Sequence, residues 1–422
     1  MLQIKEILPG ITLRCMHSSR FKQSALSIQL LRPMDKAEAA QNALLPAILL
    51  RGCREYPDLQ RITQHLDDLY GASIGTLVRR IGDYQTTGFY CGFMEDRFAL
   101  PGDRILEPMI AFATQLLLEP LLEDGCFSRD FVESEKRNLI AVIESERSDK
   151  RSYAAGQLLK IMCQNDTFGI PRLGEKEQVE AIEPLSAYAH YQKILRESPI
   201  EIFYVGSASI DTLTDLLRPA LSGLLRCPQS LPPQMPFLHA PGQEKQEIQQ
   251  IAQAKLSMGF VTPITNHDPR FAAMQVFNAV FGSGMTSKLF MEVREKMSLC
   301  YAIGSGYYGS KGILTVNAGI DSSKEQEVLQ AIHAQLQACQ AGQISDTELA
   351  AAKQSIISGL RAVYDSPGAI ENFFSTGAIS DLNRTPEVYS DQIRAVTTAD
   401  VVAAANTVTY HSTFFLKGVN HG

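Results

Sequence analysis

The chain has 422 residues, of which 45% are hydrophobic and 20% charged, as in ordinary soluble globular proteins of two or three domains. Its formal net charge of −7 argues against binding to nucleic acid, which requires a basic face, and its apolar runs are too short to span a membrane. The N-terminal stretch MLQIKEILPG lacks the pattern of a secretory signal, and the eight cysteines are scattered without a C-x-x-C pair. We therefore expect a cytoplasmic protein with reduced thiols.

Strands and helices alternate along the chain, and the two halves repeat the same order. The first half is predicted to contain a strand at 26–33, a buried helix at 42–52, an amphipathic helix at 58–71, strands at 72–82 and 84–93, a helix at 128–146 and a strand at 200–208. The second half is predicted to contain a strand at 256–263, helices at 272–282 and 286–297, strands at 298–308 and 313–320, a helix at 345–360 and a strand at 412–419.

An offset of 230 residues relates the two halves. At this offset LSIQLLRP at 26–33 corresponds to LSMGFVTP at 256–263, and Gly52 corresponds to Gly282. A whole series of matching segments in the same order indicates a duplication. Because each half mixes hairpin strands with helices, we predict an α+β fold of two duplicated half-units, each a mainly antiparallel sheet with helices packed on one face.

A proline-rich stretch at 227–243 separates the halves. Proline fixes φ and removes a hydrogen-bond donor, so this composition is typical of an extended linker. The sequence therefore predicts an N-terminal domain at 1–226 and a C-terminal domain at 244–422, each long enough to bury its own core.

Familiar catalytic motifs are either out of context or absent. Residues 71–75 match G-x-S-x-G, but a predicted helix precedes them and a strand follows, the reverse of a nucleophile elbow. Residues 304–309 match G-x-G-x-x-G, but the segment that follows is a strand and not the helix that would hold a pyrophosphate. No histidine has another within five residues, so neither H-E-x-x-H nor H-x-x-E-H occurs. What remains is Arg294, late on a helix, with Tyr301 at the start of a strand, a pair that is by itself typical of an ordinary surface arginine and a sheet tyrosine.

The segment NAVFGSGMTSKLFMEVREKMSLCYAIGSGY at 278–307 resembles the C-terminal half-unit of the insulinase and pitrilysin metallopeptidase family, which includes the mitochondrial processing peptidases and small bacterial relatives. The resemblance extends over essentially the whole chain. It rests on the glycine-rich turn, the L-F-x-E-V-R-E-K helix and a tyrosine seven residues after the arginine.

The resemblance implies that the first domain carries a degenerate zinc site. The family's H-x-x-E-H helix maps onto NALLPAILLRG, with the first histidine at Ala43, the catalytic glutamate at Pro46 and the second histidine at Ala47. The downstream glutamate ligand maps onto Glu144, which is left as an orphan carboxylate. We expect no zinc in this chain, and a helix that starts late or kinks at Pro46.

In the second domain the resemblance implies a substrate site that has been kept. The family's arginine and tyrosine, which bind the substrate backbone and help to stabilise the oxyanion, map onto Arg294 and Tyr301. Gly282 and Gly284 are expected to shape the loop that faces the substrate, although a simple turn would account for them equally well.

The expected function is that of a non-catalytic, substrate-binding subunit of a two-chain zinc peptidase, inactive as an enzyme when alone. Its partner would be a homologous chain that bears H-x-x-E-H and the zinc, with a homodimer as the other possible assembly, and its substrate a peptide. Among bacterial relatives it is similar to the partner chain associated with elongation factor P modification. Two alternatives stay open: a structural or binding protein of the same fold without a proteolytic role, and a self-sufficient enzyme with an unrecognised site.

Overall fold

The computed structural model describes residues 2–238 and 240–418, which divide into two compact units. Unit 1 comprises residues 2–144, 170–234 and 364–379, and unit 2 comprises residues 145–169, 235–363 and 380–418. Each unit therefore takes one segment from the opposite half of the chain. The predicted domains at 1–226 and 244–422 follow the repeat in the sequence and not the contacts in the structure, and they stay a prediction.

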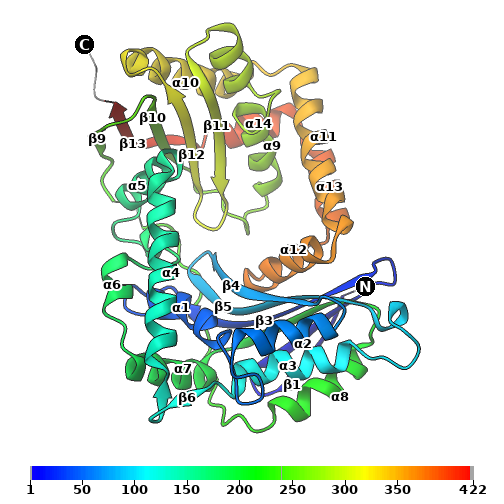
Figure 1. Ribbon diagram of the computed structural model, residues 1–422. Coiled ribbons are helices and arrows are strands. Elements are labelled where there is room, and N and C mark those ends of the chain that lie inside the picture. The colour runs from blue at the N-terminus through cyan, green and yellow to red at the C-terminus, as the bar shows by residue number, and fades with distance from the viewer. Residues whose placement is uncertain (1, 239, 419–422) are drawn as a thin grey trace. The chain divides into compact units, whose positions relative to one another are not determined.

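Unit 1 is built on a six-stranded sheet with the order β1-β2-β8-β3-β5-β4 (Figure 1). All neighbours are antiparallel except β2 and β8, which are parallel. The strands are β1 Leu2–Leu8, β2 Ile11–His17, β3 Gln23–Pro33, β4 Ser73–Ile81, β5 Tyr84–Met94 and β8 Ile200–Gly206, and a small separate ribbon joins β6 Leu122–Glu123 to β7 Cys126–Phe127. The helices are α1 Ala39–Leu49, α2 Leu59–Asp68, α3 Leu106–Leu118, α4 Arg129–Ser148 (up to residue 144), α6 Lys176–Glu180, α7 Pro184–Glu197, α8 Ile210–Leu221 and α12 Pro367–Ile379.

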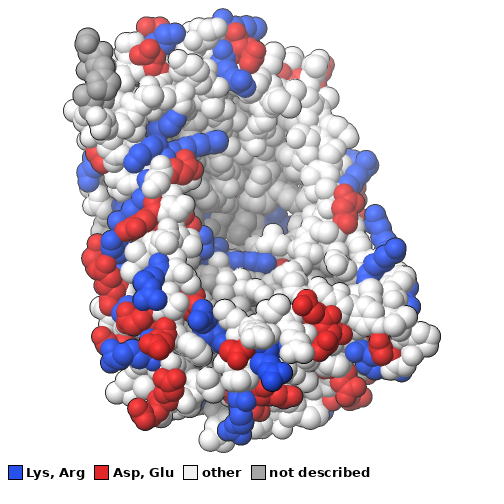
Figure 2. Space-filling model, viewed as in Figure 1, with Lys and Arg blue, Asp and Glu red and all other residues white. Residues whose placement is uncertain are grey.

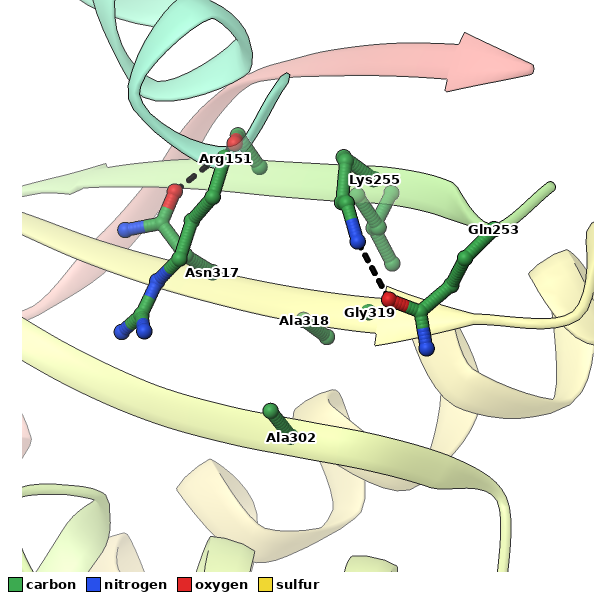
Figure 3. Close-up of a pocket in the computed structure, with 9 residues that line it drawn as sticks. Arg151, Gln253, Lys255, Ala302, Asn317, Ala318 and Gly319 are labelled. Atoms are coloured by element: carbon green, nitrogen blue, oxygen red, sulfur yellow. Dashed lines mark hydrogen bonds between the residues drawn. The ribbon is translucent and has the colours of Figure 1, made fainter. Parts of the chain in front are cut away.

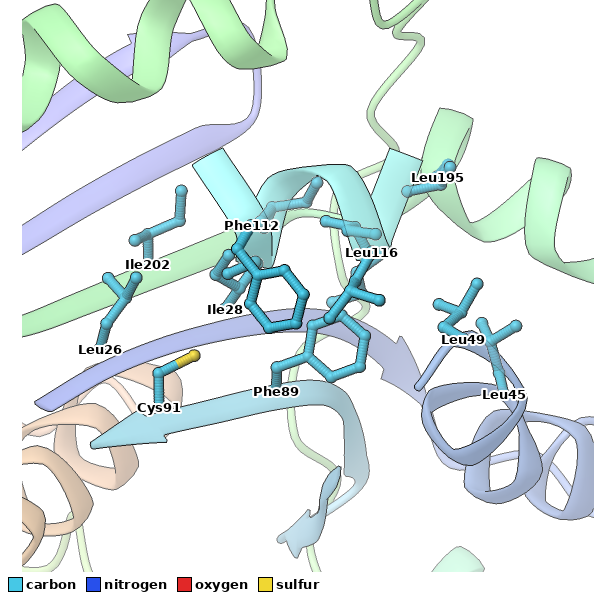
Figure 4. Close-up of a cluster of buried hydrophobic side chains, with 14 of the residues drawn as sticks. Leu26, Ile28, Leu45, Leu49, Phe89, Cys91, Phe112, Leu116, Leu195 and Ile202 are labelled. Carbon is cyan, nitrogen blue, oxygen red and sulfur yellow. The ribbon is translucent and has the colours of Figure 1, made fainter. Parts of the chain in front are cut away.

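The main core of unit 1 lies between this sheet and a layer of helices. Side chains alternate between the two faces of a strand, so Leu26 and Ile28 of β3 point to the same side as Phe89 of β5. There they pack against residues of α1 and α3 that include Leu45 and Phe112 (Figure 4).

The other face of the same sheet is covered by α12, which comes from the second half of the sequence. Glu371 on α12 is fully buried and accepts hydrogen bonds from Ser27 Oγ at 2.8 Å and from Gln29 Nε2 at 3.1 Å. Its other oxygen accepts from Arg79 Nη2 at 2.9 Å. The polar residues that alternate with the apolar ones on β3 are therefore buried partners of α12.

Unit 2 is built on a five-stranded sheet with the order β11-β12-β10-β13-β9, antiparallel except for the β9–β13 pair. The strands are β9 Glu244–Gln249, β10 Ala254–Val261, β11 Cys300–Tyr308, β12 Ile313–Ile320 and β13 Thr409–Gly418. The helices are α5 Lys150–Met162, α9 Phe271–Phe281, a π-helical segment Leu289–Lys296, α10 Glu325–Gln340, α11 Asp346–Ala362, α13 Pro386–Ala395 and α14 Thr398–Ala405. Leu256, Met258 and Phe260 of β10 face the main helical layer, whereas α5 contacts β10 and β13 with a second cluster that includes Phe414.

The two sheets have the same topology. The run β4-β5-β3-β8-β2 in unit 1 matches β11-β12-β10-β13-β9 in unit 2, and the single parallel pair occupies the same place in both. The predicted α+β class is thus confirmed, and every predicted strand is found, with residue 419 outside the described residues. The linker stretch contains neither helix nor strand at 227–238 and 240–243.

Charged side chains of both signs are interspersed over the face of the molecule that Figure 2 shows, as the modest net charge suggests. Within the described residues, no helix combines the length and apolar character needed to cross a membrane.

Candidate functional site

Helix α1 carries the positions at which the zinc motif was expected. It begins at Ala39 and continues past Pro46 to Leu49, so the expectation that the helix starts late is wrong. Proline has no N–H to donate to the carbonyl four residues earlier, that of Asn42. The Thr87 hydroxyl on β5 donates to this carbonyl at 2.6 Å and satisfies it, which allows a proline inside a buried helix.

A cavity of about 390 Å³ in unit 1 opens beside Ala43 and Ala47, which lie one turn apart on the same face of α1. Apolar groups form most of its wall. The lining residues are Ala43, Leu44 and Ala47 of α1, Thr76 and Val78 of β4, Glu135, Asn138, Leu139 and Val142 of α4, and Arg172 and Leu173 of the following loop. The methyl groups of Ala43 and Ala47 therefore stand where two imidazole ligands were mapped.

The assignment of Glu144 as the orphan ligand needs correction. Helix α4 lines the cavity with residues 135, 138, 139 and 142, the spacing of one helical face. Glu144 lies two residues beyond Val142, about 200° further round the helix. Its Oε1 accepts a hydrogen bond from Lys176 Nζ at 2.6 Å. The α4 position that shares the cavity with Ala43 and Ala47 is thus Val142, and the helical spacing of α4 would have been the signal for it.

The residues around this cavity do not fit a zinc ion. Glu135, which is only 8% exposed, is already held by Arg51 Nη1 at 3.3 Å and by Asn138 Nδ2 at 3.0 Å. Alanine and valine offer no lone pair, and across the described residues there is no group of three or more His, Cys, Asp or Glu side chains placed to hold a metal.

His190 is bonded to α1 and has a structural role. His190 Nε2 lies 2.7 Å from Asn42 Oδ1, and Asn42 Nδ2 donates to Gln85 Oε1 at 2.9 Å. Because the Asn42 amide nitrogen is used by Gln85, its oxygen must accept, which places the His190 proton on Nε2. Burial lowers the pKa of His190 to about 4, although the nearby Glu38 carboxylate works in the opposite direction. His190 is therefore neutral and fixes α1 against α7.

Arg294 lies in the last turn of the π-helical segment of unit 2. Its guanidinium carbon stands 4.6 Å from the centre of the Phe290 ring, a cation–π distance, and its side chain is 39% exposed. Burial raises the pKa of the Cys300 thiol to about 11, and the positive charge of Arg294 partly offsets this rise. The π-helical segment that carries Arg294 contacts β11, whose first residue is Cys300.

Tyr301 lies at a bulge in β11. Cys300 pairs with Ile320 and Ala302 with Gly319, so Tyr301 is the extra residue without a partner of its own on β12. A bulge changes the direction of its side chain relative to the rest of the strand. The side chain is 67% exposed, and β11 is an edge strand. The structure thus brings Arg294 and Tyr301 to the same end of β11, with both side chains accessible.

The two glycines predicted to shape the substrate loop differ in environment. Gly282 is buried at the end of α9, where an added Cβ would lie 2.6 Å from Ser305 Oγ and 2.7 Å from Leu289 Cδ1. Its place is therefore set by close packing. Gly284 is exposed, has φ +121° and has open space around it, so it requires glycine for its backbone conformation.

Known proteins are similar to this chain. The family model described as "Peptidase M16 inactive domain" matches residues 182–356. A Bacillus subtilis protein named "Probable inactive metalloprotease YmfF" is 29% identical over 413 residues, which cover 97% of this chain and 96% of that one.

Two solved structures share the fold over the whole chain. A conserved protein from Enterococcus faecalis superposes with a TM-score of 0.93 at 26% identity, and the match covers 100% of this chain and 99% of that one. A peptidase M16 inactive domain from Pseudomonas fluorescens gives a TM-score of 0.82 at 17% identity, and the match covers 99% and 98% of the two chains.

Proposed function

We propose that this chain is a member of the M16 peptidase family, which includes insulinase and pitrilysin, without the zinc-binding motif, and that it is the non-catalytic, substrate-binding subunit of a two-chain zinc metallopeptidase. Its partner is a homologous chain that carries H-x-x-E-H and the zinc ion. The substrate is a peptide.

The observation that carries the proposal is the accessible Arg294 and Tyr301 pair at the β11 edge of the unit 2 sheet, in a chain with alanine at residues 43 and 47 of its cavity. A guanidinium and a phenol hydroxyl are both donors suited to a peptide carbonyl or to the oxyanion that forms during cleavage. The groups that would activate water are missing from α1. The chemical step therefore belongs to the partner, and this chain supplies donors to the bound peptide.

The test combines the purified chain with each H-x-x-E-H-bearing homologue from the same genome and measures cleavage of a quenched fluorescent peptide library. Loss of one oxyanion donor costs about 3 kcal/mol, so we expect Tyr301→Phe and Arg294→Ala to lower the cleavage rate about 100-fold. Tyr308→Phe is the matched control, because it removes the same hydroxyl group from the same strand.

Unchanged cleavage by both variants would contradict the proposal and favour the alternative, a structural or binding protein of this fold. Size-exclusion chromatography with light scattering of the mixture and of the chain alone separates a heterodimer from a homodimer. A finer form of the proposal connects the pair with modification of elongation factor P. Mass spectrometry of that factor from a strain that lacks this chain tests it, and an unaltered modification state would remove the connection.

A further inference from the structure

A second, much smaller cavity of about 40 Å³ lies in unit 2, over the sheet near the start of β11. Its lining is polar at the sides and small at the base. The lining residues are Arg151, Gln253, Lys255, Leu256, Ser257, Ala302, Asn317, Ala318 and Gly319. Figure 3 shows Arg151 and Asn317 on one side and Lys255 and Gln253 on the other, with Ala302, Ala318 and Gly319 between them.

The polar side chains of this cavity present donors. Lys255 Nζ donates to Gln253 Oε1, which leaves the amide nitrogen of Gln253 as a donor. Asn317 Oδ1 accepts from Ser257 Oγ at 2.7 Å, which in turn leaves Asn317 Nδ2 as a donor. Together with the guanidinium of Arg151, N–H groups from four side chains border one small space.

The lining of the cavity carries two cations, Arg151 and Lys255. Within the described part of the chain, no carboxylate lines it. The carboxylate of Asp149 acts on Lys255 from outside the lining, and it caps α5 by accepting from Arg151 N at 3.0 Å and Ser152 Oγ at 2.6 Å. Burial lowers the pKa of Lys255, Asp149 works against this, and the positive charge of Arg151 adds to the lowering. Two cations are therefore held near each other at the N-terminus of a helix, where an anion is favoured.

The base of the cavity is shaped to leave space above it. A Cβ on Gly319 would lie 2.9 Å from Gln253 Oε1, so a larger residue at this position would displace the amide from its place over the sheet. The cavity volume of about 40 Å³ exceeds the roughly 10–15 Å³ that a cavity needs to hold one water molecule, so a group as small as a carboxylate can enter it. An arginine beside a lysine is suited to its two oxygens.

We infer that this cavity binds a carboxylate group of the peptide held by Arg294 and Tyr301. Ala302, which lines the cavity, directly follows Tyr301, and no strand among the described residues pairs with the outer side of β11. An extended peptide along that open edge would bring a carboxylate within reach of the cavity. The inference rests on the proposed function, which makes the ligand a peptide. It adds that this peptide carries a negative charge where it meets the cavity.

Binding by the purified full chain tests the inference. The chain contains no tryptophan, so the fluorescence anisotropy of a short peptide with one tryptophan reports binding without background from the protein. Three peptides of the same neutral sequence are compared: one ends in an amide, one in a free carboxylate, and one in an amide with a central glutamate. We expect one or both acidic peptides to bind about 10-fold more tightly than the neutral one. The acidic peptide that binds more tightly shows whether the cavity takes a C-terminal carboxylate or a glutamate side chain.

Variants separate this cavity from general electrostatics. Arg151→Gln and Lys255→Gln should each reduce the preference for acid about 10-fold, whereas Lys245→Gln on β9 is the matched control and should keep it. Ala302→Leu fills the cavity from the exposed edge strand without a change of charge, and should abolish the preference.

The inference is overturned if no peptide binds, if all three bind equally, if the preference survives Arg151→Gln, or if it is lost equally in Lys245→Gln. The cleavage assay with Arg294 and Tyr301 variants is independent of these results. Failure of the carboxylate cavity is therefore distinguishable from failure of the proposed function.

Discussion

Rebuilding the zinc site tests which residues of unit 1 surround it. The variant Ala43→His, Pro46→Glu, Ala47→His and Val142→Glu places two imidazoles and one carboxylate at residues of α1 and α4 that line the cavity, and a second carboxylate on α1 at residue 46. The matched variant has the same three changes on α1, retains Val142 and depends on the native Glu144. Removing Pro46 also restores a helical N–H.

The expected difference follows from ligand number. Loss of a direct ligand weakens zinc binding by at least about 100-fold, since even outer-shell changes cost about 10–100-fold. At zinc 100 times above the dissociation constant of the rebuilt site, binding stabilises unit 1 by about 2.7 kcal/mol. The same zinc concentration equals the dissociation constant of the matched variant, so zinc binding stabilises that variant by only about 0.4 kcal/mol. The thermal unfolding midpoint rises by about 2–4 °C for each kcal/mol of stabilisation. Zinc should therefore raise the midpoint by about 5–10 °C in the rebuilt variant and by about 1 °C in the matched variant.

The assay is thermal unfolding with and without zinc, together with elemental analysis of the purified proteins. We expect about one zinc per rebuilt chain and no stoichiometric zinc in the wild type, which has alanine at residues 43 and 47 and valine at residue 142. Equal zinc content in the rebuilt and matched variants would refute the placement of Val142, and one tightly held zinc in the wild type would refute the degenerate site.

Two further predictions concern the support of α1. Thr87→Val leaves the buried Asn42 carbonyl of α1 without its donor and should lower the free energy of unfolding by about 1–3 kcal/mol. Pro46→Ala supplies a helical N–H to the same carbonyl and should restore most of that loss. Urea unfolding of the two single variants and the double variant, as a double-mutant cycle, measures both effects. An additive result would show that the two groups do not share this carbonyl. The pKa of His190 is lowered from 6.5 to about 4, so between these pH values the unfolded chain takes up a proton that the folded chain refuses. Stability should therefore fall by about 3 kcal/mol as pH drops through this window, and His190→Gln should flatten the curve; an unchanged slope would contradict a neutral, buried His190.

The fold class could be predicted from the sequence because its signal is local and repeated. The strands at 26–33 and 256–263 each carry their apolar residues at alternate positions, and the segments that follow repeat in the same order. The loss of zinc chemistry could be predicted as well. It depends on the identity of residues 43 and 47, and no packing can give alanine a lone pair.

Only the tertiary structure determines which side chains of distant segments face each other. The resemblance to the family placed the third ligand at Glu144 because that ligand is a carboxylate. Tertiary packing sets which face of α4 is turned toward α1, and this face brings Val142 to the cavity. Ser27 and Gln29 are polar residues within an otherwise apolar strand, and their burial against Glu371 depends on α12, which comes from more than 300 positions later in the chain. Local patterns determine which elements form, but a hydrogen bond, a cavity wall or a cluster of charges between distant segments exists only after those elements have packed.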